Sequence, residues 1–149
     1  EFSEDIIGAL KFSASAINGL NGDDVRVSKR SFLSQRKLRG FKAGKVGPKD
    51  GDDYIGGNYT TALNLEANFP NFFPEKSNAE VGLFFDAGNV WGVDYSDSID
   101  DSNEIRSSLG FNLSWISPAG PMTFVISNNV SKASTDQDES FNFRLGTTF

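Results

Sequence analysis

The chemistry open to this chain is narrow, because two of the most reactive side-chain types are missing. The 149 residues contain no histidine and no cysteine. Their absence excludes Ser-His-Asp and Cys-His nucleophilic sites, and also zinc sites built on imidazole or thiolate. The run Asp50-Gly51-Asp52-Asp53 looks like the start of an EF-hand loop, but the twelfth position is Thr61 instead of glutamate. We therefore predict no catalytic site, no metal site and no cofactor, and we do not expect an enzyme.

Charged residues offer ion-pair chemistry instead. Glu66 and Asp86 each lie on the polar side of a segment in which apolar and polar residues alternate, and the two segments are neighbours in sequence. If the apolar sides face lipid, both carboxylates point into the interior of a barrel. An arginine suits such a pair, because its guanidinium presents five donors in one plane. Arg39, in the longest loop, is the candidate for this role.

Alternation with a period of two predicts the strands that position these groups. The clear segments are Asn58–Phe69, Ala79–Trp91, Ile105–Trp115, Met122–Val130 and Phe141–Phe149, and the weaker ones are Ile6–Ile17 and Val25–Leu33. We predict an all-β fold of about seven antiparallel strands with no substantial helix, in one domain or part of one.

The connections and the strand faces favour a transmembrane β-barrel. Tight turns alternate with three longer polar loops, Gln35–Gly57, Gly92–Asn103 and Lys132–Ser140, as expected for a barrel with short turns on one side of a membrane. The last two loops are acidic, and we expect their carboxylates to be solvated. The apolar faces end in aromatic residues, while the opposite faces are rich in Gly, Ser, Asn and Thr. The alternative is a small soluble ligand-binding β-barrel whose apolar face points inward. The net charge of −6 argues against a nucleic-acid partner.

An ordered series of motifs resembles one family closely. These motifs are Leu38-Arg39-Gly40-Phe41, Gly47-Pro48-Lys49, Gly56-Gly57-Asn58, Phe84-Phe85-Asp86-Ala87-Gly88-Asn89-Val90-Trp91, Arg106-Ser107-Ser108-Leu109-Gly110, Trp115-Ile116-Ser117-Pro118-Ala119-Gly120-Pro121 and the terminal Phe141–Phe149. In this order they resemble the C-terminal part of the barrel of BamA-type outer-membrane assembly factors, of the bacterial surface antigen family. The resemblance runs from about Val25 to Phe149.

The resemblance implies a location and a function. Members insert and fold other β-barrel proteins in the bacterial outer membrane, and they carry periplasmic POTRA domains before a barrel of sixteen strands. Residues 1–149 would be a C-terminal portion of that barrel, without POTRA domains. The implied partners are outer-membrane lipid, nascent outer-membrane β-barrel proteins and, for the full-length parent, the lipoproteins of the assembly complex. A translocation-assembly or two-partner secretion transporter of the same superfamily remains an alternative.

The resemblance also implies roles for particular residues. The loop that carries Arg39, Gly40 and Phe41 would fold back into the lumen, where Arg39 would meet Glu66 and Asp86, Gly40 would allow a sharp turn and Phe41 would wedge the loop against the wall. The last strand resembles the sorting signal of outer-membrane barrels, carried here by Phe141, Phe143, Leu145 and Phe149.

About seven strands cannot close as the parent barrel does, and they leave two edges of unpaired backbone groups. We expect the fragment either to pair edge-to-edge with a second copy, as a homo-oligomer, or to close on itself.

Overall fold

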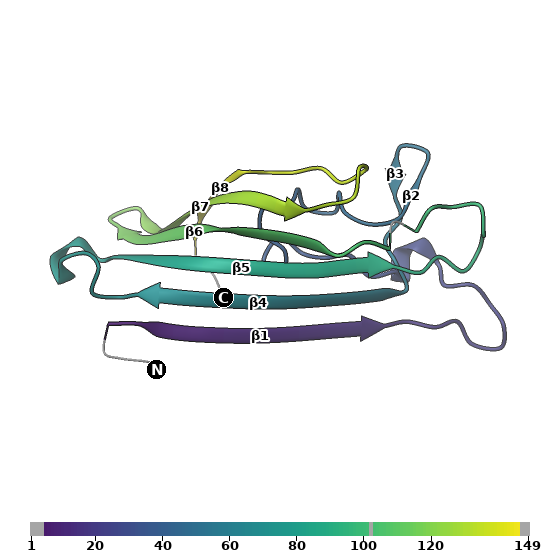
Figure 1. Ribbon diagram of the computed structural model, residues 1–149, viewed down its shortest axis with the longest axis horizontal. Helices are drawn as coiled ribbons and strands as arrows, with labels where there is room; N and C mark the ends of the chain where they lie inside the picture. Colours follow the sequence, from purple (N-terminus) through teal and green to yellow (C-terminus); the bar gives the residue numbers. More distant parts are fainter. Residues whose placement is uncertain (1–4, 102, 147–149) are drawn as a thin grey trace.

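The computed structural model describes residues 5–101 and 103–146 and shows one large antiparallel sheet. Its six strands lie in the order β1-β4-β5-β6-β7-β8 (Figure 1). β1 pairs with β4, and from β4 onward each strand pairs with the strand that follows it in the sequence. Their bounds are β1 Ile7–Ala16, β4 Tyr59–Phe69, β5 Ala79–Trp91, β6 Arg106–Ser117, β7 Gly120–Ser131 and β8 Phe141–Leu145. A separate hairpin consists of β2, Lys49–Asp50, and β3, Asp53–Tyr54.

These strands confirm the all-β antiparallel prediction. The segment Ala79–Trp91 is a strand over the whole predicted range, and the four other clear segments agree within two residues wherever the structure describes them. The end of the last predicted strand lies outside the described residues. The weaker segment Ile6–Ile17 corresponds to β1. Alternation therefore located all six strands of the sheet.

The prediction of a strand over Val25–Leu33 is wrong. The segment contains a short 3₁₀ helix, η1, at Val27–Lys29, and only Ser31 forms a β-bridge, with Gly57. The guanidinium of Arg30 donates through Nε and Nη2 to the backbone carbonyl of Val25, at 3.2 and 3.0 Å. This contact curls the chain back on itself, so the apolar residues of this segment mark a folded loop and not a strand.

The two faces of the sheet have opposite environments. Large apolar side chains on one face are exposed: Leu10, Phe12, Leu65, Leu83, Phe85, Leu109, Phe111, Trp115, Ile126, Phe141, Phe143 and Leu145. The other face carries buried residues, among them Asp86, Ser108, Asn112 and Ser127. A soluble ligand-binding barrel would bury its apolar face, so this arrangement favours the lipid-facing interpretation of the sequence.

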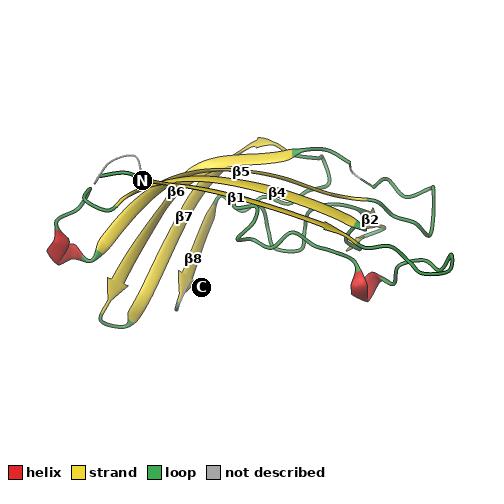
Figure 2. Ribbon diagram, turned by 90° about the horizontal axis from the view of Figure 1, so that it is seen from below, coloured by secondary structure: helices red, strands yellow, loops and turns green. Residues whose placement is uncertain are grey.

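The loop between β1 and β4 covers the polar face. The sheet arches, and irregular segments lie beneath the arch (Figure 2). From this loop, Leu33, Leu38, Phe41 and Val46 form a core cluster with Ala62 of β4 and Val90 of β5. The main apolar core therefore lies between the loop and the polar face of the sheet, while the apolar face of the sheet is exposed.

A second short 3₁₀ helix, η2, at Glu75–Ser77, lies between β4 and β5. None of the helices in the described part of the chain has the length and apolar character to cross a membrane. Among the described residues, β1 and β8 are the outermost strands and do not pair with each other, so the sheet is open.

Candidate functional site

The structure brings Arg39 against Asp86. The Arg39 guanidinium donates from Nε to Asp86 Oδ2 at 2.7 Å and from Nη2 to Oδ1 at 2.8 Å. The backbone N–H of Arg39 donates to the same Oδ2 at 3.0 Å. Asp86 is fully buried, at 0% exposure, and Arg39 is 8% exposed. A two-pronged pair of this kind fixes the orientation of the guanidinium as well as its position.

Glu66 completes the clamp from the neighbouring strand, as β4 pairs with β5. Arg39 Nη1 donates to Glu66 Oε2 at 2.7 Å, and Asn112 Nδ2 donates to Oε1 at 3.3 Å. Burial alone would lower the pKa of Arg39, but hydrogen bonds and charges from Asp86 and then Glu66 outweigh it and raise that pKa above its ordinary value. Arg39 is therefore held firmly in its charged form between two carboxylates.

Phe84 is a component of the site that the sequence analysis missed. Its ring lies beneath the guanidinium of Arg39, 3.8 Å from the ring centroid to Cζ, and the residue is 4% exposed. Gly110 on β6 leaves room for this ring, because a Cβ there would lie 2.8 Å from Phe84 Cζ. The available signal was a phenylalanine on the polar side of β5, two residues before Asp86.

Gly40 and Phe41 shape the loop that carries Arg39. Gly40 has a φ of +90°, and a Cβ there would lie 2.7 Å from Asn129 Oδ1 and 3.0 Å from Ser108 Cβ. Glycine therefore permits both the backbone turn and the close approach of the loop to β6 and β7. Phe41 is 2% exposed and packs in the core cluster between loop and sheet.

The residues of the predicted sorting signal lie away from this clamp. Phe141, Phe143 and Leu145 are exposed on the apolar face of β8, and Phe124 of β7 contacts Phe143 with ring centroids 5.0 Å apart. Phe149 lies outside the described residues.

The expectation that the carboxylates of the acidic loops are solvated is wrong for Asp136, and Asp94, although exposed, also has an arginine partner. Asp136 is 5% exposed and accepts two hydrogen bonds from Arg106. Asp94 accepts from the Arg30 guanidinium at 2.7 Å and from the backbone N–H of Val25 at 2.9 Å. Both carboxylates have arginines far away in sequence as partners, and nothing in the local composition of these loops indicates them.

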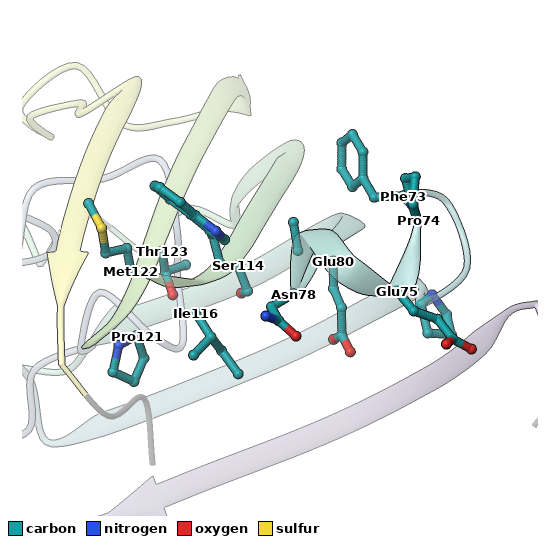
Figure 3. Close-up of a pocket in the computed structure, with 13 residues that line it drawn as sticks. Phe73, Pro74, Glu75, Asn78, Glu80, Ser114, Ile116, Pro121, Met122 and Thr123 are labelled. Carbon is teal, nitrogen blue, oxygen red and sulfur yellow. The ribbon is translucent and has the colours of Figure 1, made fainter. Parts of the chain in front are cut away.

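Among the cavities that adjoin the sheet in the described structure, two have several polar residues in their lining. One, of about 360 Å³, lies beside the clamp and is lined by polar and charged residues that include Arg39, Glu66 and Arg144. The other, of about 490 Å³, lies at the end of the sheet with the short connections. It lies between the β4–β5 segment that carries Pro74 and Asn78 and the adjoining ends of β6, with Ile116, and β7, with Pro121 (Figure 3). The residues that line this second cavity include none of the predicted site residues.

The arrangement is suited to holding a loop in place. Within residues 5–101 and 103–146, no group of three or more carboxylates is placed to hold a metal ion. Instead the carboxylates of the clamp have a guanidinium and amide donors as partners, which joins the loop to strands β4 and β5.

The sequence and the fold match known proteins. Residues 1–149 match the Omp85 superfamily domain. The chain is 29% identical over 151 residues to the outer membrane protein assembly factor BamA of Neorickettsia risticii (strain Illinois). This match covers 99% of this chain and 20% of that protein. It is 33% identical over 141 residues to BamA of Neisseria meningitidis serogroup B, covering 75% of this chain and 17% of that protein. The chain thus spans about a fifth of the length of these curated relatives.

Among solved structures, BamA from Haemophilus ducreyi lacking POTRA domains 1-3 has the same fold, with a TM-score of 0.79 and 29% sequence identity. The match covers 93% of this chain and 31% of that one. The shared fold, the exposed apolar face and these relatives identify a BamA-type β-barrel segment of the bacterial outer membrane. The family model covers the chain from end to end, and the chain therefore belongs to the Omp85 superfamily.

Proposed function

We propose that this chain is part of an outer-membrane protein insertase, which folds β-barrel proteins and inserts them into the bacterial outer membrane. The observation that carries the proposal is the buried clamp of Arg39 by Asp86 and Glu66. The clamp holds a long loop against the polar face of the sheet, while the apolar face points outward. The chain belongs to the Omp85 superfamily, and an arginine and two carboxylates hold this one loop in a fixed position. In this proposal the fixed loop takes part in the function of the protein, beyond connecting two strands.

In this proposal, residues 1–149 form the C-terminal portion of the barrel domain of a full-length parent. The backbone groups at the outer edges of β1 and β8 would pair with strands of the rest of that barrel, because unpaired groups are costly in lipid. The partners would be nascent outer-membrane β-barrel proteins, outer-membrane lipid and the lipoproteins of an assembly complex. No covalent step is involved, and the protein would act by positioning strands.

Depletion of the full-length parent in its own host tests this function. If the protein is an insertase, the folded forms of several unrelated outer-membrane β-barrel proteins should all fall, as measured by their heat-modifiable migration in gels. Loss of a single exported protein, with the other barrels unchanged, would contradict the insertase and indicate a two-partner secretion transporter instead.

A further inference from the structure

A second arginine–carboxylate pair lies in the described structure, apart from the Arg39 clamp, and it is more deeply buried. Arg106 begins β6, and Asp136 lies in the loop between β7 and β8. Both side chains are 0% exposed. Arg106 Nε donates to Asp136 Oδ2 at 2.7 Å, and Nη2 donates to Oδ1 at 3.1 Å. The pair is two-pronged, as at Arg39.

The remaining donors and acceptors of this pair join four parts of the chain. Arg106 Nη1 donates to Asn89 Oδ1 on β5 at 2.7 Å. Asp136 Oδ1 accepts from the backbone N–H of Gly47 at 3.3 Å, and Oδ2 accepts from the N–H of Ala133 at 2.8 Å. Gly47 belongs to the loop that carries Arg39. The pair therefore connects β5, β6 and the β7–β8 loop to that same loop, eight residues beyond the arginine of the clamp.

Backbone contacts extend this attachment. Phe41 forms an antiparallel bridge with Asp138. Lys42 donates its backbone N–H to Gln137 at 2.9 Å, and Glu139 donates its N–H to the carbonyl of Gly40, also at 2.9 Å. The β7–β8 loop thus pairs with the segment that follows Arg39, and β8 begins only two residues after Glu139.

We propose that Arg106 and Asp136 are positioning residues that attach the Arg39 loop at a second point. They connect it to the segment that leads into the first residue of β8, Phe141. The Arg39 clamp holds the loop to β4 and β5. The Arg106 pair, on the same face of the sheet, holds it to β6 and to the segment that leads into β8. A loop held at both points cannot move away from the sheet without breaking two buried ion pairs, and any shift of β8 at this end is transmitted to it.

Disulfide formation in the full-length parent tests this attachment. The chain has no cysteine, and Lys42 and Gln137 are exposed neighbours across the two loops. In a parent without other cysteines, Lys42→Cys with Gln137→Cys should oxidise rapidly. Arg106→Gln and Asp136→Asn should each slow that oxidation by about tenfold, measured only on folded, heat-modifiable barrel. The double variant Arg106→Gln with Asp136→Asn leaves no buried charge unpaired, and it should slow oxidation by less than the product of the single effects.

Lys132→Gln is the matched control, because Lys132 pairs with Asp138 in the same loop but both side chains are substantially exposed. It should oxidise at the rate of the parent pair. Equal rates in the Arg106 variant, the Asp136 variant and this control would overturn the attachment. The attachment does not rest on the proposed function. Slow oxidation in the Arg106 and Asp136 variants of a parent that assembles no substrate β-barrel would count against the proposed function and leave the attachment standing.

Discussion

Asp86 binds Arg39 at both ends of the residue. Its Oδ2 accepts from the guanidinium at 2.7 Å and from the backbone N–H at 3.0 Å. One buried carboxylate of β5 therefore fixes both the path of the loop and the direction in which its arginine points. Phe84, two residues earlier on the same face, supports the guanidinium from below. Most of the clamp comes from β5, and the neighbouring strand β4 contributes Glu66.

The two carboxylates should differ in importance. Asp86→Asn leaves a buried guanidinium without its two-pronged acceptor, and we expect it to weaken docking of the loop by about 3–5 kcal/mol. Glu66→Gln should cost about 1 kcal/mol, because the Glu66 side chain is 27% exposed and makes one contact with Arg39. The rate of trypsin cleavage within residues 36–57 of the full-length parent measures docking. Faster cleavage in Glu66→Gln than in Asp86→Asn would contradict this order.

Gly40→Ala should loosen the loop without any change of charge. A φ of +90° is strained for any residue with a Cβ, and the added methyl would meet Asn129 and Ser108. We expect a cost of about 1–3 kcal/mol and faster cleavage of the loop by trypsin. Gly44→Ala is the control, because Gly44 also has a positive φ but nothing lies within 4 Å of its Cβ position. If both variants are cleaved equally fast, the close approach at Gly40 has no role.

Phe84 and Phe85 are adjacent in sequence and lie on opposite faces of the sheet. Phe84→Leu removes the ring beneath Arg39, and we expect a loss of about 1–2 kcal/mol in loop docking. Phe85→Leu changes an exposed side chain of the apolar face and should leave docking unchanged. Trypsin cleavage of the two variants, compared side by side, tests this assignment. An equal effect would show that the ring acts through the general stability of β5.

Phe149 should act in sorting of the protein to the membrane. The resemblance of Phe141–Phe149 to the sorting signal of outer-membrane barrels implies that its last aromatic residue is read by the assembly machinery. Deletion of Phe149 in the full-length parent should therefore slow its insertion more than Thr147→Ala does. Pulse-labelling followed by the appearance of the heat-modifiable form measures insertion. Equal rates would leave Phe149 as an ordinary strand residue.

The sequence predicted the sheet well, because alternation reports directly on the two faces of a strand. The same parity placed Glu66 and Asp86 on one face, where the structure finds them. Val25–Leu33 was misassigned because a side-chain contact within the segment, from the Arg30 guanidinium to the Val25 carbonyl five residues earlier, decides its path. Asp136 looked like a solvated loop residue, since its partner Arg106 lies 30 residues away. Alternation carries no information about contacts of this kind between a loop and a strand.

Arg39→Lys is the most direct test of the central claim, that a planar, two-carboxylate clamp on the loop supports outer-membrane assembly. Lysine keeps the charge but cannot bridge Asp86 and Glu66 in a fixed plane. We would measure the rate at which the full-length parent, in reconstituted vesicles, assembles a substrate β-barrel. Arg26→Lys, at an exposed arginine, is the control. The account predicts a fall of about tenfold for Arg39→Lys with an unchanged amount of folded barrel, and a parental rate for Arg26→Lys. A parental rate for Arg39→Lys would contradict it.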